Sequence, residues 1–132
     1  MFVRILVSAA IAMMAMTGMA AAQQAAPQTI KRTVLQKFDV PGANYETVIG
    51  IAEILPNVNI GRHTHPGPEG GYMIEGEMVL MVEGQPAKTI KQGDSYQIPS
   101  GAVHDAKTGP AGAKVIASYV VEKGKPLATP AP

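Results

Sequence analysis

Short runs of apolar and β-branched residues, separated by turn residues, follow one another from residue 31 to residue 121. We interpret these runs as strands at 34–38, 45–55, 58–65, 71–75, 77–82, 87–90, 95–98, 103–107 and 114–121. Segments 75–76 and 108–110 are among the predicted turns between them. No stretch after residue 30 has a helical period over about eleven residues. Short strands with a turn about every eight to twelve residues predict an all-β sandwich or barrel.

Residues 1–22 have the composition of a secretory signal peptide. Arg4 makes the start basic, residues 5–16 are apolar and uncharged, and alanines at 20–22 provide a cleavage site. A retained anchor and a buried helix are the alternatives, although a membrane span needs about 20 strongly apolar residues. We predict cleavage after Ala22 by the general secretory route. The mature protein is then periplasmic or secreted and has no stable membrane association.

The chain has 132 residues, which is enough for one domain. Residues 23–30 are polar and rich in alanine, so we predict a flexible leader there. Residues 31–125 form the predicted β-domain. Residues 126–132 consist mostly of proline and alanine, a composition that predicts a disordered tail.

Cysteine content and charge exclude several kinds of site and partner. The chain has no cysteine, so it has neither disulfides nor metal-binding thiolates. It has 11 lysines and arginines against 10 acidic residues, and removing Arg4 with the signal leaves ten of each. A neutral domain without a basic cluster argues against nucleic acid and anionic membranes as partners. Any metal site must use histidine and carboxylate ligands.

All three histidines fall in two short segments, and one glutamate follows the first of these segments. His63 and His65 are two residues apart, so on a strand both rings lie on one face. Glu69 comes after a Pro-Gly-Pro turn, and His104 comes after a turn at 99–101. Isolated histidines are usually surface or hydrogen-bonded core residues, but these four side chains can converge. Such a set suits one divalent ion of iron, manganese, nickel, copper, cobalt or zinc.

Two sequence motifs resemble those of the cupin superfamily, in particular the small, single-domain, quercetin dioxygenase-like cupins. Residues 57–76, NVNIGRHTHPGPEGGYMIEG, resemble cupin motif one, G(x)5HxH(x)3,4E(x)6G. Residues 93–108, GDSYQIPSGAVHDAKT, resemble motif two, G(x)5PxG(x)2H(x)3N. Asn57 and Thr108 depart from the motif glycine and asparagine. Asparagine tolerates a left-handed backbone better than most residues, so the first change is mild.

The resemblance covers residues 45–121 and implies a double-stranded β-helix, or jelly-roll barrel, with a metal ion in its mouth. It implies that His63, His65, Glu69 and His104 are the metal ligands. It also implies that Glu69 can act as both ligand and catalytic base. Four protein ligands on an octahedral metal leave about two positions open. By analogy with compact cupins, a homodimer is possible.

Strand alternation extends these expectations to the walls of the site. Residues that share the face of a ligand are expected to line the cavity: Asn59, Gly61, Met73, Ala102 and Ala106. Ile60 and Arg62 are expected to point away from the face of His63. Asp105 is expected to point outward. The hydroxyl groups of three tyrosines, Tyr72, Tyr96 and Tyr119, are further candidates for contact with a substrate.

Three functions agree with these expectations. The first is a metal-dependent enzyme that acts on a small organic molecule. Dioxygenase chemistry is the leading variety, and isomerase, lyase and decarboxylase chemistries remain open because the fold does not choose among them. The second is a non-catalytic binder or sensor of a small ligand. The third is a metal site that only stabilises the barrel, although structural sites are normally closed.

Overall fold

The described part of the chain is built from strands alone. The structure is a computed structural model that describes residues 28–132, so the predicted signal peptide lies outside the described residues. The strands are β1 (Ile30–Asp39), β2 (Tyr45–Ile54), β3 (His63–Thr64), β4 (Glu69–Val82), β5 (Lys88–Lys91), β6 (Ser95–Ile98), β7 (His104–Glu122) and β8 (Thr129–Pro130). Within residues 28–132 no helix is long and apolar enough to cross a membrane. The all-β prediction is confirmed.

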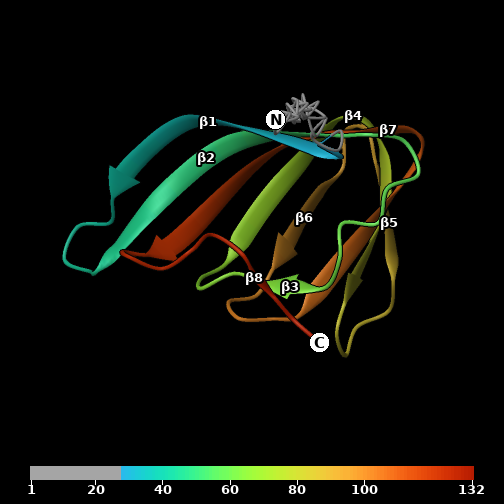
Figure 1. Cartoon of the computed structure of the whole chain (residues 1–132). Coiled ribbons are helices and arrows are strands. Elements are labelled where there is room, and N and C mark those ends of the chain that lie inside the picture. The colour runs from blue at the N-terminus through green and yellow to red at the C-terminus, as the bar shows by residue number, and fades with distance from the viewer. Residues whose placement is uncertain (1–27) are drawn as a thin grey trace, which may run out of the picture.

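The long strand β7 pairs with three other strands, β2, β3 and β4. Its C-terminal half lies between β2 and β4, and its first residue, His104, pairs with His63 of β3. β1 pairs with β2 at one edge, while β5 and β6 pair with β4. All pairings are antiparallel, and the sheet curls so that β3 lies beneath the long strands (Figure 1). This curl brings segments far apart in the sequence to one end of the barrel.

Strands β4 and β7 are longer than predicted because two expected turns are bends within strands. Segments 75–76 and 108–110 lie inside β4 and β7, whose register shifts between Met73 and Glu75 and again between Gly76 and Met78. Gly76 has a φ of 79°, and a Cβ there would lie 2.0 Å from the carbonyl oxygen of Gly112. Gly76 therefore permits a sharp bend where β4 pairs closely with β7, without ending either strand.

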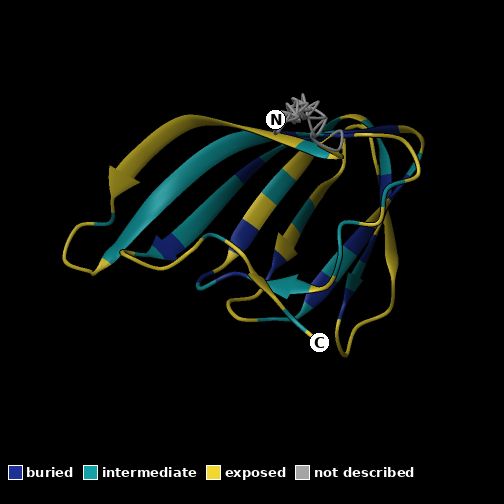
Figure 2. Ribbon diagram, viewed as in Figure 1, coloured by how far each residue is buried: buried dark blue, intermediate teal, exposed yellow. Residues whose placement is uncertain are grey.

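The barrel interior is filled by alternate residues of the strands. β4 contributes Met73, Met78 and Leu80, and β7 contributes Val115. Met73 and Ile90 are fully buried. Burying one such side chain contributes roughly 1.5–3 kcal/mol. Buried and exposed bands alternate along β4 in Figure 2, as expected for a strand with one face toward the core.

The prediction of a disordered tail at 126–132 is wrong. Strand β8 pairs with β3, and the amide of Ala131 donates to the carbonyl oxygen of Arg62 at 3.0 Å. The guanidinium of Arg62 also donates, at 2.7 Å, to the carbonyl oxygen of Pro132. Proline and alanine offer little to a core, but their main-chain groups pair with the free edge of β3. Composition does not reveal that edge.

Candidate metal centre

The three histidines converge at one end of the barrel. His63 lies in β3, His65 follows that strand directly, and His104 begins β7 as the register partner of His63. The ring centroids are 4.9 Å apart for His63 and His65, 4.1 Å for His63 and His104, and 4.9 Å for His65 and His104. One ring nitrogen from each residue lies within 4.8 Å of the others. Strand pairing therefore confirms that the two histidine segments meet.

A main-chain carbonyl holds the Nδ1 atom of each imidazole. His63 Nδ1 lies 2.7 Å from the oxygen of Gly61, and His104 Nδ1 lies 2.9 Å from the oxygen of Ala102. His65 Nδ1 lies 2.6 Å from the oxygen of Leu127 in the C-terminal segment. A carbonyl oxygen only accepts hydrogen bonds, so each Nδ1 carries a proton, and in the neutral ring Nε2 is then the nitrogen with the lone pair. This is the tautomer that a metal ligand needs.

The carboxylate of Glu69 lies beside two of these imidazoles. Its Oε2 is 2.9 Å from His65 Nε2 and 3.9 Å from His104 Nε2. The hydroxyl of Tyr96 donates to its Oε1 at 2.8 Å. Because His65 Nδ1 holds the proton, the close approach of Nε2 and Oε2 joins two acceptors. A positive charge, from a proton or a metal ion, is needed to make this contact favourable.

Burial controls the ionisation of the groups around the site. Burial lowers the pKa of His63 and of His104, and their hydrogen bonds to the carbonyls of Gly61 and Ala102 offset this in part. Burial and the charge of Glu69 raise the pKa of Tyr96. Burial, and after it the negative charge of Glu69, also raises the pKa of Tyr119. His63 and His104 are therefore neutral at pH 7, and both phenols keep their protons.

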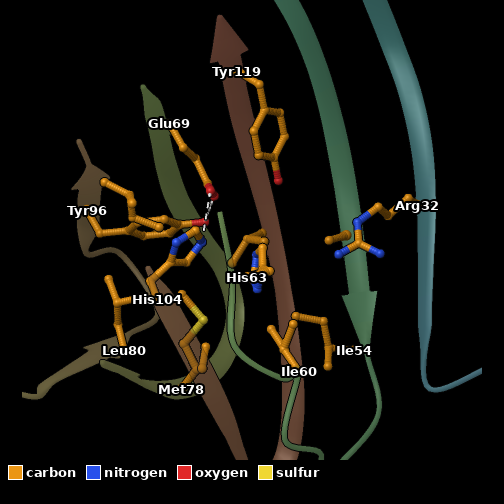
Figure 3. Close-up of a pocket in the computed structure, with 14 residues that line it drawn as sticks. Arg32, Ile54, Ile60, His63, Glu69, Met78, Leu80, Tyr96, His104 and Tyr119 are labelled. Atoms are coloured by element: carbon orange, nitrogen blue, oxygen red, sulfur yellow. Dashed lines mark hydrogen bonds and ion pairs between the residues drawn. The ribbon is translucent and has the colours of Figure 1, made fainter. Parts of the chain in front are cut away.

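A small cavity of about 40 Å³ opens beside the histidines (Figure 3). Its polar lining consists of His63, Glu69, Tyr96, His104, Tyr119 and Arg32. The rest of its lining is apolar: Ala52, Ile54, Ile60, Met78, Leu80, Ile98, Ala106 and Val115. Glu69, Tyr96 and His104 lie on one side in Figure 3, and Arg32 reaches in from the opposite side. The cavity thus has polar groups at both ends, and the labelled apolar side chains of Ile54, Ile60, Met78 and Leu80 lie along one side of it (Figure 3).

Strand alternation predicted this lining only in part. Ala106 lines the cavity, whereas Asn59, Gly61, Met73 and Ala102 do not. Ile60 lines it too, so the expectation that this residue points away is wrong. The reason is Gly61, whose φ of 96° breaks the alternation between residue 60 and His63. Of the three candidate tyrosines, Tyr96 and Tyr119 line the cavity, and Tyr72 is 48% exposed and does not.

Asp105 lies outside the cavity and holds the loop before β3. Its carboxylate accepts a hydrogen bond of 2.8 Å from the amide of Gly61 and one of 2.9 Å from the side chain of Asn59. Gly61 in turn supplies the carbonyl that holds His63. Asp105 therefore positions His63 indirectly, a role that the sequence did not suggest.

The two departures from the cupin motifs have local explanations. Asn57 has a φ of 57° and is the only non-glycine residue with positive φ among residues 28–132. This confirms that the change from glycine is mild. The hydroxyl of Thr108 donates to the carbonyl oxygen of Leu55 at 2.7 Å and accepts from the amide of Val58 at 2.9 Å. Thr108 thus fastens the turn that leads to the histidine loop.

Comparisons with known proteins agree with the fold. Residues 50–124 match the family described as cupin domain. Dimethylsulfoniopropionate lyase DddW of Ruegeria pomeroyi is 34% identical over 67 residues, which make up 51% of this chain and 43% of that protein. The chain thus spans less than half of this curated relative.

Two solved structures have the same fold. DMSP lyase DddQ from Ruegeria pomeroyi has a TM-score of 0.65 at 17% identity, covering 77% of this chain and 51% of that chain. Recombinant oxalate oxidase in complex with glycolate has a TM-score of 0.60 at 20% identity, covering 80% of this chain and 57% of that one. These likenesses confirm the predicted jelly-roll barrel.

Proposed function

The chain belongs to the cupin family, and from this premise we propose that it is a metal-dependent enzyme acting on a small organic molecule. One observation carries the proposal. Three imidazoles have their Nδ1 atoms held by main-chain carbonyls and direct their Nε2 atoms to a common point beside a cavity. A histidine cluster that only packed in the core would not need three rings in the same tautomer.

The residues present fit a divalent transition metal. His63, His65 and His104 would hold it through neutral nitrogen ligands, which suit iron, manganese, nickel, copper, cobalt or zinc. We propose Glu69 as the fourth ligand, because a metal ion near His65 supplies the positive charge that their 2.9 Å contact needs. A bound ion of this kind would polarise an oxygen atom of the substrate as a Lewis acid.

The size of the cavity limits the substrate. A water needs roughly 10–15 Å³ of such space, so a cavity of about 40 Å³ has room for a molecule of only a few non-hydrogen atoms. A flavonoid, as in the quercetin dioxygenase-like cupins, would require the walls to move apart. Small acids or alcohols fit better.

We place elimination first among the possible reactions. Glu69 lies next to the three histidines, and the Tyr96 hydroxyl fixes its orientation, so it can accept a proton from a substrate carbon. The C–H electron pair would then form a carbon–carbon double bond, while the bond to the leaving group breaks and its pair stays with that group. The similarity to a dimethylsulfoniopropionate lyase supports this class of reaction.

Dioxygenase chemistry is the second candidate. His63, His65 and His104 would hold the ion, and Glu69 would be a fourth protein ligand. The remaining positions could take a substrate and dioxygen together. Oxygen consumption separates this reaction from elimination, which uses no oxygen.

The test combines metal analysis with activity. The full-length purified protein is stripped with a chelator and reloaded with each of the six metals. It is assayed for alkene formation with acids of three to five carbons that carry a leaving group on the β-carbon, and for oxygen uptake with acids of two to five carbons. We expect one metal ion per chain, and loss of that ion in His104→Ala. Metal content unchanged in His104→Ala would contradict the site. Binding of an acid without turnover would instead support a binder or sensor, and metal that raises only the melting temperature would support a structural site.

A further inference from the structure

Arg32 is a charged residue at an inward-facing position of the sheet. It pairs with Ala52 of β2, Ala52 pairs with Val115 of β7, and Val115 pairs with Met73 of β4. Residues directly opposite each other on antiparallel strands project to the same face. Ala52, Val115 and Met73 are all buried in the core, so this row of the sheet faces the barrel interior.

The side chain of Arg32 lies where the inner cavity meets the surface. It lines the cavity beside the histidines, and it also lines an outer groove of about 310 Å³. The two hollows share Arg32, Ile60 and His63, and the C-terminal residues Ala128 and Pro130 form part of the outer wall. A molecule at the junction of the two hollows therefore lies beside both the guanidinium and His63.

The charge of Arg32 has no acidic partner within 4 Å among residues 28–132. The other arginine of the described chain, Arg62, pairs with Glu83 at 2.8 Å. The one acidic group of the cavity, Glu69, lies at its opposite end and hydrogen-bonds Tyr96.

We propose that Arg32 binds the carboxylate of a small organic acid whose other end reaches the three histidines. The inference rests on the proposed function and names the class of substrate for that site. A guanidinium offers two parallel N–H donors that match a carboxylate. The apolar residues along one side of the cavity, among them Ile54, Ile60 and Leu80, suit a short carbon chain (Figure 3).

A second role for Arg32 would need no ligand. β1 is an edge strand, and charged residues that point inward on such strands discourage pairing with other chains. This role predicts that replacing Arg32 promotes self-association and leaves ligand affinity unchanged. The two roles therefore differ in a measurable way.

The experiment is calorimetric titration with propanoate and with propanamide, which has the same shape without the charge. Wild type, Arg32→Gln and the matched control Lys37→Gln, an exposed cation of the same strand that lines neither hollow, are compared, both loaded with metal and stripped of it. We expect propanoate to bind wild type at least about 10-fold more tightly than propanamide, because the carboxylate hydrogen bonds are charge-assisted. We expect Arg32→Gln to lose about 10-fold or more of that affinity while keeping its metal, and Lys37→Gln to behave like wild type.

Several results would overturn the inference: no binding of propanoate, equal binding of the acid and the amide, or equal affinity in wild type and Arg32→Gln. Size-exclusion chromatography of the same variants shows whether only self-association changes, which also overturns it. If Arg32→Gln does not fold, Arg32→Lys is used, because it keeps the positive charge without the two parallel N–H donors of the guanidinium. A several-fold loss of propanoate affinity is expected for Arg32→Lys. Arg32-dependent binding in a protein that binds no metal would refute the proposed function and leave this inference standing.

Discussion

At the scale of single residues, the contact between His65 and Glu69 determines what the site can hold. The Nδ1–H of His65 donates a hydrogen bond to the carbonyl oxygen of Leu127, and its Nε2 lies 2.9 Å from a carboxylate oxygen of Glu69. Two acceptor atoms, Nε2 of a neutral His65 and Oε2 of Glu69, repel each other at this distance unless a proton or a metal ion lies between them. The pair therefore favours binding of a positive ion even without a substrate.

We expect Glu69→Gln to abolish turnover while the barrel remains folded. An amide is neither an anionic ligand nor a base, so metal affinity should fall about 10-fold and the rate at least about 100-fold. Metal titration and steady-state assays measure the two effects separately. Glu75→Gln, an exposed glutamate of the same strand, is the matched control. Unchanged turnover in Glu69→Gln would exclude Glu69 as the base.

The buried imidazoles predict how the metal-free protein responds to acid. An imidazole in the unfolded chain has a pKa of about 6.5, and burial lowers the pKa of His63 and His104 in the fold. Between the two values the unfolded state binds more protons, so the free energy of unfolding rises with pH. We expect full stability above about pH 6.5 and a decline as the pH falls through the folded pKa values. Urea denaturation from pH 8 to pH 5 measures it, and a double variant, His63→Gln with His104→Gln, should show a shallower decline.

The sequence predicted the histidines well and their surroundings poorly. The spacing of His63 and His65 carries the information, because residues two apart on a strand project to one face, and the turn at 99–101 directs His104 toward them. The acceptors of their Nδ1 protons are main-chain carbonyls, which every residue has, so composition cannot single out Leu127. Arg32 was missed because its direction follows from its pairing with Ala52, and pairing is a property of the folded sheet.

At the scale of elements, the C-terminal segment belongs to the site although it carries none of the three histidines. Strand β8 pairs with β3, and the carbonyl of Leu127 holds His65. Groups that orient a metal ligand usually account for 10–100-fold in affinity. We expect truncation after Lys125 to weaken metal binding by about this 10–100-fold factor, as measured by competition with a chelator.

Truncation after Ala128 is the matched control, since it removes β8 and retains the Leu127 carbonyl. An intermediate affinity is expected for it. Equal affinities in wild type and both truncated proteins would show that the segment only covers the surface.

The close contact of Gly76 with Gly112 predicts that adding one methyl group at residue 76 lowers the free energy of unfolding substantially. Gly76→Ala places a Cβ 2.0 Å from the oxygen of Gly112 and forces a left-handed backbone on alanine. We expect a loss of about 3 kcal/mol or more in the free energy of unfolding, because main-chain atoms must move. Chemical denaturation measures it against Gly70→Ala, where a Cβ meets nothing within 4 Å. A loss of less than about 1 kcal/mol in the free energy of unfolding would mean that β4 and β7 can move apart at this point.

The same bend explains why the prediction of strands was incomplete. Glycine and proline at 75–76 and 108–110 are typical of turns, but here they bend strands that continue. Local sequence cannot distinguish a bend from a reversal, because the difference lies in whether the next residues find the same partner strand. β4 and β7 do find each other again after both shifts.

At the scale of the whole molecule, the barrel was predictable because its turns and motifs are spread along most of the chain. Export stays a prediction, since residues 1–22 lie outside the described part. We expect the mature protein to begin at Gln23. Intact-mass measurement of the protein from the periplasmic fraction tests this, and a mass that includes residues 1–22 would contradict it.

The predicted homodimer also remains open to measurement. Edge strand β1 exposes Val34, Leu35 and Phe38, which are 64%, 44% and 52% accessible. Light scattering across a range of protein concentrations gives the mass in solution.

The pairing of the last strands with β3 sets an order of events during synthesis. His63 meets its partner only when residue 104 has been translated, and His65 receives its hydrogen bond only when residue 127 has. A nascent chain that still lacks its final segment therefore has histidines but no finished coordination site. A translocated chain, as the predicted signal implies, crosses the membrane unfolded and would capture its ion on the far side. The metal supply of that compartment, rather than of the cytoplasm, would then decide which ion the protein carries.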